Sequence, residues 1–286
     1  MTRLRFAFLF MVFYEAPVLD QTLPRALTIA GFDPTGGAGI LADSRVFERF
    51  GYRTSAILAC LVPQSVDRVF SVEPVSVPAF RRQFEALADE AAPDTIKIGA
   101  IGSADLLAPI HEYLLRTSHQ PSVADPVLRA SDGTELFPPE ARKEYLDRLG
   151  RHVALLTPNA GEAFALSDLP DTESPVRAAE ILLSSGVPAV LIKSAKQNAE
   201  IVADLFWPKN LSSPIWFEHS RRQEAMPHGS GCHLSSAIAS YLGRGENLES
   251  AVRKGLTWFQ RALVESPIRS SVRSIFRRLP APVEEF

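Results

Sequence analysis

Cysteine and net charge are both scarce in this sequence of 286 residues. Two cysteines, Cys60 and Cys232, are too few for a disulfide framework and favour a reducing, cytoplasmic setting. A formal net charge of −3 argues against a nucleic-acid partner that is bound by broad neutralisation of phosphates. With 46 % hydrophobic and 22 % charged residues, the chain has the composition of a soluble globular protein with a substantial core.

A membrane-spanning run is also lacking. Residues 1–14 place Arg3 and Arg5 ahead of a short apolar stretch, which resembles the start of a signal peptide. The stretch is shorter than the roughly 20 apolar residues that span a bilayer, and no small-residue cleavage site follows it. We therefore expect no membrane partner. Residues 1–24 are predicted to be an N-terminal extension: an added edge strand, a disordered tail or the product of a start codon placed too early.

Two common nucleotide-binding signatures are absent as well. No P-loop of the form G-x-x-x-x-G-K-[ST] occurs, and the glycine-rich run at 36–39 does not fit the dinucleotide pattern G-x-G-x-x-G in its usual frame. That run follows a predicted strand. It therefore forms either a tight turn or a stretch of backbone that a ligand approaches closely.

What the sequence does contain is a regular alternation of apolar runs and helical patterns. Short apolar runs predict strands at 26–30, 54–62, 95–98, 122–124, 154–157 and 189–193, with a peripheral pair at 203–207 and 214–217. Helical spacing predicts helices at 40–50, 78–90, 104–116, 139–149, 174–185, 232–242 and 248–263. This order indicates βαβ units and an α/β protein with a mainly parallel sheet covered on both faces. No linker interrupts residues 25–265, which form one predicted domain, and the basic stretch 266–286 is predicted to be a solvated C-terminal tail.

The segment Gly229-Ser230-Gly231-Cys232 opens one of the predicted helices. Glycines before a helix let backbone N–H groups turn toward an anion, and the helix dipole adds to the attraction, so a phosphate is the natural ligand. A cysteine in the first turn would have its thiolate stabilised by the same field and would serve as a general base toward a hydroxyl. An ordinary glycine-led helix start, with Cys232 as a small buried residue, explains the same residues.

Further polar side chains follow the predicted strands, at the sheet edge where ligands bind in open parallel sheets. Asp125 and Glu162 are the best candidates to arrange Mg²⁺, which at nucleotide sites uses one or two carboxylates and keeps several waters. Lys193 ends a strand at the same edge, where it either contacts phosphate or is simply solvated. As structural alternatives, Asp125 is a helix N-cap, Glu162 a surface charge and His228 an ordinary loop histidine.

Together these motifs resemble the hydroxymethylpyrimidine phosphate kinases of the ribokinase-like superfamily. ALTIAGFDPTGGAGILAD is similar to that family's opening A-L-T-I-A-G-S-D-P-S-G-G-A-G-I-Q-A-D, and MPHGSGCHLSSAIA is similar to its H-G-T-G-C-T-L-S-A-A-I-A. Between them, IKIGAIGS, ADPVLRASDG, LLTPNAGEA and VLIKSA resemble the family's K-I-G-M-L, D-P-V-M-V-A-K-S-G, N-x-x-E and V-L-V-K-G-G segments in the same order. The resemblance covers about residues 25–265.

The resemblance implies a three-layer α/β/α ribokinase-like fold with a mainly parallel central sheet and no large lid domain. It implies ATP- and Mg²⁺-dependent phosphorylation of 4-amino-5-hydroxymethyl-2-methylpyrimidine and then of its monophosphate in thiamine biosynthesis, by a homodimer. The site residues that it implies are Gly31, Asp43, Gln64 and Val127 for the pyrimidine; Gly229, Ser230, Gly231 and Cys232 for the γ-phosphate, with Cys232 as base; Asp125, Asn159 and Glu162 for the Mg²⁺–phosphate network; and Lys193 and His228 for phosphate contacts.

The sequence also departs from that family's pattern around the expected site. The departures are Leu41 and Ala100; Arg129, Ser131 and Asp132, in a segment where a lysine of the family is lost; and Ser194, Ala195 and Lys196 in place of a G-G-H turn. They leave two alternatives open. One is a pyridoxal or pyridoxine kinase on the same fold, and the other is a degenerate kinase that binds the pyrimidine without turnover.

Overall fold

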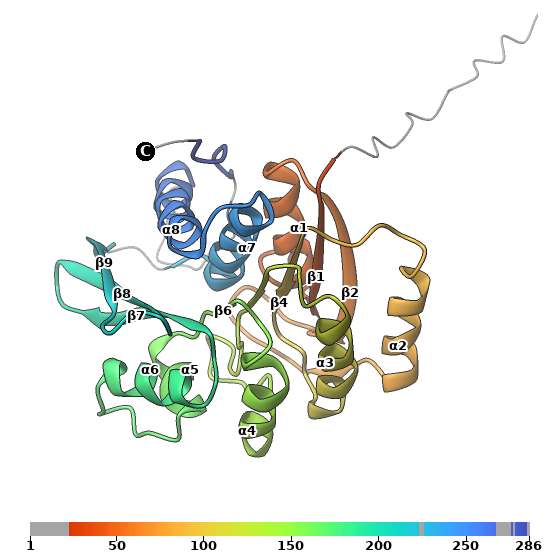
Figure 1. Ribbon diagram of the computed structural model, residues 1–286, viewed down its shortest axis with the longest axis horizontal. Helices are drawn as coiled ribbons and strands as arrows, with labels where there is room; N and C mark the ends of the chain where they lie inside the picture. The colour runs from red at the N-terminus through yellow and green to blue at the C-terminus, as the bar shows by residue number, and fades with distance from the viewer. Residues whose placement is uncertain (1–22, 223–225, 267–275, 277, 285–286) are drawn as a thin grey trace, which may run out of the picture.

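The computed structural model describes residues 23–222, 226–266, 276 and 278–284. A nine-stranded sheet with the order β3-β2-β1-β4-β5-β6-β7-β8-β9 runs through this part of the chain (Figure 1). From β2 to β7 in this order the strands are parallel, whereas β3, β8 and β9 are antiparallel to their neighbours. The strands are β1 (Arg25–Phe32), β2 (Arg53–Leu61), β3 (Glu73–Pro74), β4 (Thr95–Ile98), β5 (Ser122–Ala124), β6 (Leu155–Leu156), β7 (Ala189–Gln197), β8 (Ile201–Pro208) and β9 (Ile215–Ser220).

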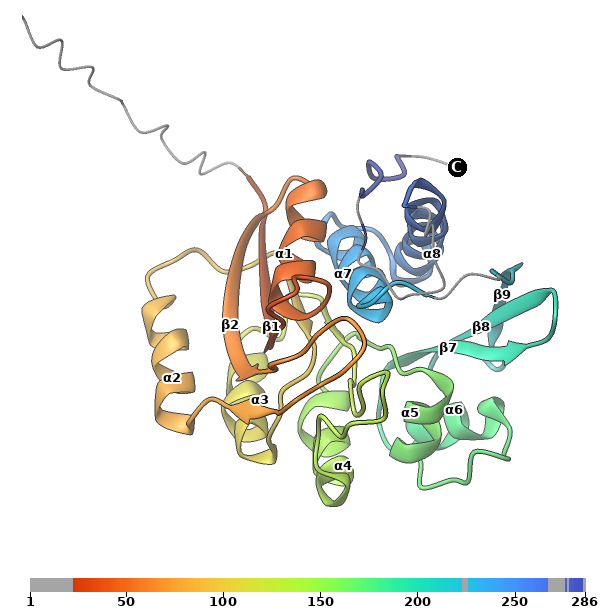
Figure 2. The same cartoon turned by 180° about the vertical axis from the view of Figure 1, so that it is seen from behind.

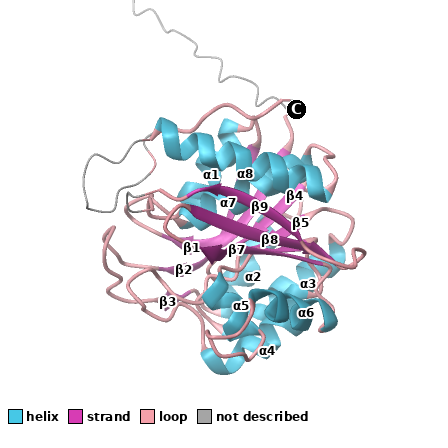
Figure 3. Cartoon of the chain, turned by 90° about the vertical axis from the view of Figure 1, so that its left-hand side faces the viewer, coloured by secondary structure: helices cyan, strands magenta, loops and turns pink. Residues whose placement is uncertain are grey.

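Helices cover both faces of the sheet, which gives the predicted three layers (Figures 2 and 3). One face carries α1 (Gly39–Arg49), α7 (Ser230–Gly243) and α8 (Leu248–Glu265). The other carries α2 (Val77–Ala86), α3 (Leu107–Arg116), α4 (Arg142–Tyr145), α5 (Ala160–Leu166) and α6 (Pro175–Ser184). The α/β prediction is therefore confirmed, and so is the mainly parallel sheet.

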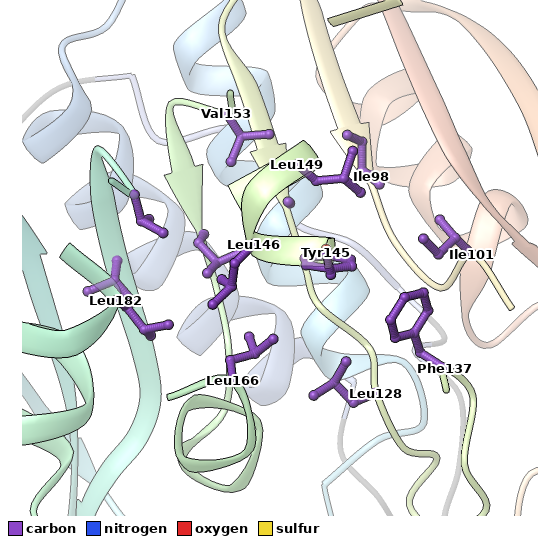
Figure 4. Close-up of a cluster of buried hydrophobic side chains, with 14 of the residues drawn as sticks. Ile98, Ile101, Leu128, Phe137, Tyr145, Leu146, Leu149, Val153, Leu166 and Leu182 are labelled. Carbon is purple, nitrogen blue, oxygen red and sulfur yellow. The ribbon is translucent and has the colours of Figure 1, made fainter. Parts of the chain in front are cut away.

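The core is divided into two clusters by the sheet itself. Successive side chains of a strand point to opposite faces, so Ala26 packs toward α7 and α8 while Leu27 and Ile29 pack toward α2 and α3. Figure 4 shows part of the second cluster, where Ile98 and Tyr145 lie among leucines of neighbouring elements. Because both faces are covered, the central strands are mostly apolar rather than alternating, which is why short apolar runs located them.

The segment predicted as one helix at 139–149 is composite. It begins with a 3-10 turn at Pro139–Ala141, continues as α4 and ends in a wide π turn at Leu146–Gly150. Two elements were not predicted from the sequence: the two-residue strand β3 and the short helix α5. Neither is long enough to show a hydrophobic period.

The described part of the C-terminal tail is partly packed against the domain, with Phe276 and Pro280 buried, whereas Arg278, Ala281 and Glu284 are exposed as predicted for a solvated tail. Phe276 is 3 % exposed, and its ring centroid lies 4.3 Å from that of His233 in α7. The backbone of the tail is fixed as well, because Trp258 donates to the Pro280 carbonyl at 3.0 Å and the Val283 N–H donates to the Tyr241 hydroxyl at 2.6 Å.

Two further predictions concern the ends of the chain. The N-terminal extension 1–24 lies outside the described residues except for Leu23 and Pro24, and residues 267–275 of the tail also lie outside them. Within the described ranges, no helix has both the length and the apolar character needed to cross a membrane.

Candidate active site

A cavity of about 480 Å³ lies at the edge of the sheet where the parallel strands end. Segments that follow β1, β2, β4, β5 and β6 form its wall, together with β7 and the start of α7. The cavity is lined by all of the predicted site residues except Asp43, namely Gly31, Gln64, Val127, Lys193, Asn159, His228, Gly229, Ser230, Gly231, Cys232, Asp125 and Glu162. Residues up to 201 positions apart therefore meet here, from Gly31 to Cys232.

The first turn of α7 forms one wall of the cavity. Gly229, the residue before the helix, has φ +74°, a left-handed conformation that glycine adopts without strain. A side chain there would also collide with the carbonyl oxygen of Gly37, so the two glycine-rich loops are in direct contact. The first N–H groups of a helix have no partner within it and carry a partial positive charge, so this turn is suited to a phosphate.

Asp125 and Lys193 form an ion pair directly beneath that turn. Lys193 Nζ lies 2.6 Å from Asp125 Oδ1, and a Cβ at Gly231 would lie 3.1 Å from both Lys193 Nζ and Asp125 Oδ2. Asp125 is 2 % exposed and also accepts from the Thr157 hydroxyl at 3.2 Å. Burial alone would lower the pKa of Lys193, but the charges of Asp125 and Glu162 outweigh it and raise that pKa. The lysine is therefore charged and close to the place where a phosphate would sit.

Glu162 and Asn159 begin helix α5 with a capping box. The Asn159 side chain accepts from the Glu162 N–H at 2.9 Å, and Glu162 Oε2 accepts from the Asn159 N–H at 2.8 Å. Glu162 is 7 % exposed, so the alternative of a surface charge is excluded. Its burial raises its pKa to about 7, against the opposing charge of Lys193 and with a further contribution from Asp125.

The donor set fits Mg²⁺ held partly through waters. Asp125 and Glu162 both line the cavity, and the charge of Asp125 adds to the rise in the pKa of Glu162, which a bound divalent cation would reverse. Mg²⁺ at nucleotide sites usually takes one or two carboxylates and completes its shell with water and phosphate oxygens. Within the described ranges, no group of three or more His, Cys, Asp or Glu side chains is arranged to hold a metal by itself.

Cys232 differs from the expectation in its ionisation. Its side chain is 8 % exposed, and burial raises the pKa of the thiol to about 11, with Lys97 opposing the rise and Asp43 and Asp125 adding to it. Burial of the thiol therefore opposes the predicted stabilisation of the thiolate by the helix field. Desolvation is the larger effect there.

The chain is similar in sequence to a family of known kinases. The family model for phosphomethylpyrimidine kinase matches residues 33–272. The hydroxymethylpyrimidine/phosphomethylpyrimidine kinase of Escherichia coli (strain K12) is 34 % identical over 247 residues, which cover 84 % of this chain and 91 % of that protein. The chain belongs to the phosphomethylpyrimidine kinase family. The predicted resemblance is confirmed, and with it the assignment as a phosphotransferase.

Solved structures agree with this membership. The phosphomethylpyrimidine kinase from Clostridium difficile 630 has a TM-score of 0.70 at 30 % identity, with 84 % of this chain and 99 % of that chain covered. The pyridoxal kinase from Staphylococcus aureus, in complex with AMP-PCP and pyridoxal, has a TM-score of 0.77 at 25 % identity, with 88 % and 93 % covered. The ribokinase-like fold is therefore shared with kinases of two different ring substrates.

Asp43, predicted as a pyrimidine ligand, is fully buried and is not among the residues that line the cavity. Both its oxygens lie 2.9 Å from Lys97 Nζ, and the hydroxyls of Thr28 and Ser236 donate to them at 2.6 and 2.9 Å. Asp43 and Lys97 have no solvent exposure. Burial by itself lowers the pKa of Lys97, yet the charge of Asp43 outweighs it and raises that pKa above its ordinary value. Asp43 therefore connects β1, β4 and α7 beneath the residues that line the cavity.

Sequence reasoning missed Asp33, which organises the first glycine-rich loop. It is 2 % exposed, and its carboxylate accepts from the Thr35 N–H, the Thr35 hydroxyl and the Ala38 N–H at 2.8 to 2.9 Å. His228 Nε2 lies 2.9 Å from the same carboxylate. Burial tends to raise the pKa of Asp33, but these hydrogen bonds outweigh it and lower that pKa. The order Asp-Pro-Thr-Gly is typical of a turn in which an aspartate binds the backbone two residues ahead, and that signal was available.

Two loops cover the other side of the cavity. Asp132 Oδ2 accepts from the Val69 N–H at 2.7 Å, which connects the loop after β5 to the loop after β2. Arg129 in the first of these loops donates to Glu135 at 2.6 Å. The Asp132–Val69 contact thus uses one of the positions where the chain departs from the pattern of the family.

The turn after Lys193 has a left-handed backbone conformation. Ser194, which replaces a glycine of the family's V-L-V-K-G-G segment, has φ +50°, and its N–H donates to Asp204 at 2.7 Å. Lys196 lies with Nζ 4.1 Å from the centre of the Trp216 ring. Asp204 therefore stabilises at Ser194 a conformation that L-residues rarely adopt.

Proposed function

We propose that this kinase transfers the γ-phosphate of ATP to the hydroxymethyl oxygen of 4-amino-5-hydroxymethyl-2-methylpyrimidine, and then phosphorylates the resulting monophosphate, in thiamine biosynthesis. The observation that carries the proposal is the first turn of α7, which lies so close to the Asp125–Lys193 pair that a Cβ at Gly231 would be 3.1 Å from both side chains. An anion site between a helix N-terminus and a charged lysine suits the phosphoryl group in transit.

Phosphoryl transfer asks mainly for positioning and charge neutralisation. The new bond joins the hydroxymethyl oxygen to the γ-phosphorus, and the bond that breaks joins that phosphorus to the oxygen of ADP. The N–H groups at the start of α7 and the Lys193 ammonium neutralise charge on the phosphoryl oxygens. Asp125 and Glu162 would hold Mg²⁺, which when bound supplies further neutralisation of the phosphates.

The hydroxyl proton needs an acceptor, and Cys232 is suited to that role by its position. It lies in the first turn of α7 and lines the cavity beside the proposed phosphate site. Its raised pKa makes it a weak acid, and hence a strong base in the fraction of molecules where it is ionised. A loose transition state demands little proton removal before the phosphorus–oxygen bond breaks, so a largely neutral thiol is compatible with turnover.

The ring of the substrate would lie between Gly31, Gln64 and Val127. These residues line the cavity and follow or end strands other than β7. A Cβ at Gly31 would lie 2.9 Å from Cys60 Sγ and 3.2 Å from a Val62 methyl, so the wall beside it is tightly packed. A flat ring fits such a wall better than a puckered sugar.

Pyridoxal is the second candidate substrate, because the pyridoxal kinase of Staphylococcus aureus superimposes with a TM-score of 0.77. Coupled ATP consumption in the presence of Mg²⁺ separates the candidates when the pyrimidine, its monophosphate and pyridoxal are compared. We expect turnover with the pyrimidine compounds to exceed that with pyridoxal. Turnover with pyridoxal alone would establish the second candidate, and binding of the pyrimidine without turnover would indicate a degenerate kinase. The homodimer and the cytoplasmic location stay predictions.

A further inference from the structure

We propose that Asp33 and His228 are a positioning pair that holds the phosphate-binding turn of α7 against the first glycine-rich loop. This inference rests on the proposed function, since it names how the phosphate site is kept in shape. It also changes the part assigned to His228, from a ligand of phosphate to a residue that acts through Asp33.

The contact joins segments that are 195 residues apart in sequence. His228 immediately precedes Gly229, and its Nε2 lies 2.9 Å from Asp33 Oδ2. An ionised carboxylate only accepts hydrogen bonds, so Nε2 carries the proton and donates. The Asp33 side chain is 2 % exposed and that of His228 is 12 % exposed, so water competes little for this hydrogen bond.

Asp33 reaches the phosphate site by a second route as well. The Ala38 N–H donates to Asp33 Oδ2 at 2.8 Å, which fixes the backbone just before Gly39. Ala38 lies against the phosphate-binding turn, since a Cβ at Gly229 would lie 2.9 Å from the Ala38 Cα. One carboxylate thus holds both the residue before that turn and the loop residue packed against it.

The first glycine-rich loop and the turn before α7 are packed tightly together. Loss of the Asp33–His228 hydrogen bond would therefore displace the phosphate-binding turn. A side chain at Gly229 would overlap the Gly37 carbonyl, so the backbones touch without an intervening residue. A displacement of about 1 Å in groups that position a reacting centre costs about 10²-fold in rate. Of the ring-binding residues, Gly31 is held within β1, and Gln64 and Val127 belong to other loops, so ring binding should be spared.

The test compares His228→Ala with His228→Gln, whose side-chain amide can donate to Asp33 in place of Nε2–H. The readouts are kcat in the coupled assay, calorimetric affinity for a non-hydrolysable ATP analogue with Mg²⁺, calorimetric affinity for the pyrimidine, and the melting temperature. His119→Gln is the matched control, because this histidine is exposed and lies away from the cavity.

We expect His228→Ala to lower kcat about 10- to 100-fold and to weaken binding of the ATP analogue, with pyrimidine affinity unchanged within about twofold. His228→Gln should recover most of the loss. Asp33→Asn should resemble His228→Ala, and the double variant should be no slower than the slower single one, because the two residues act as a unit.

Three results would contradict the proposal that Asp33 and His228 act as a positioning pair. These are natural kcat and analogue affinity in His228→Ala, no recovery in His228→Gln, or a loss of pyrimidine affinity as large as the loss of kcat. If the natural protein binds both ligands but turns nothing over, the proposed function fails. The analogue affinities of the variants still decide for or against the pair in that case.

Discussion

Lys97 and Asp43 form a fully buried ion pair below the phosphate-binding turn. Lys97 comes from β4 and Asp43 from α1, and their side chains have no solvent exposure. Thr28 of β1 and Ser236 of α7 donate to the same carboxylate, so the pair connects the sheet to both helices that flank the cavity.

We expect Lys97→Met to destabilise the fold by about 3–5 kcal/mol, because it leaves the Asp43 charge buried without its cation. Denaturant unfolding measures the change. Arg81→Met is the matched control, since it breaks the exposed Arg81–Glu112 pair, whose ions are 2.6 Å apart. Its unfolding midpoint should stay almost unchanged. A Lys97→Met protein as stable as the control would show that the buried pair is not structural.

Lys193→Met tests the charge beneath the phosphate-binding turn. The substitution keeps the length of the side chain but leaves Asp125 without the partner 2.6 Å away. We expect kcat to fall about 10²–10³-fold, as for loss of one preorganised group at a reacting centre. Calorimetry should show weakened ATP binding and unchanged pyrimidine binding. Equal losses for both ligands would contradict a role specific to phosphate.

Cys232→Ser tests the proton acceptor. With a pKa of about 11 the free thiol is neutral at pH 7, so its ionised fraction rises with pH up to that value. The value of kcat/KM, which reports the free enzyme, should therefore rise from pH 7 to 9 in the natural protein. The serine variant should be about 10²–10⁴-fold slower and lack this rise. A serine variant with the natural rate and the same profile would remove Cys232 from the proposed role.

The burial of His233 leads us to expect that the folded protein becomes less stable in acid. Burial lowers its pKa to about 4, with Arg45, Lys97 and His228 adding to the decrease and a hydrogen bond to the Gly229 carbonyl opposing it. The unfolded chain takes up a proton below its ordinary value of 6.5 but the folded chain does not. Stability from this group is complete above that pH and is lost as the pH falls toward 4, by about 3 kcal/mol in all.

The measurement is the free energy of unfolding at pH 7 and at pH 4 for the natural protein and for His233→Asn, which keeps a donor toward Gly229. The natural protein should lose about 3 kcal/mol more than the variant over this interval. His119→Asn, an exposed control, should behave as the natural protein does. The same loss in natural protein and His233→Asn would contradict the assignment.

Most of the fold was predictable because both faces of the sheet are covered. Apolar runs such as 95–98 coincide with β4, and helical spacing located α7 and α8 within two residues at each end. Elements that lack a period, such as β3 and α5, were missed, since two to seven residues carry too little pattern.

Most of the residues that line the cavity were predicted from the sequence, but the contacts among them were not. Strand ends bring polar residues to one edge, and this located Asp125 and Lys193. The burial of Asp43 depends on Lys97, which is 54 residues away, and the link between Asp33 and His228 spans 195 residues. Pairings of this range are set by packing, and no local pattern in the sequence encodes them.

The proposed function is tested most directly by the mass of the product formed from 4-amino-5-hydroxymethyl-2-methylpyrimidine by the purified protein with ATP and Mg²⁺. We expect a pyrimidine carrying one phosphate and then two, each formed with one equivalent of ADP, and little phosphorylation of pyridoxal under the same conditions. An unchanged pyrimidine, with ATP intact or with pyridoxal phosphorylated in its place, would contradict it.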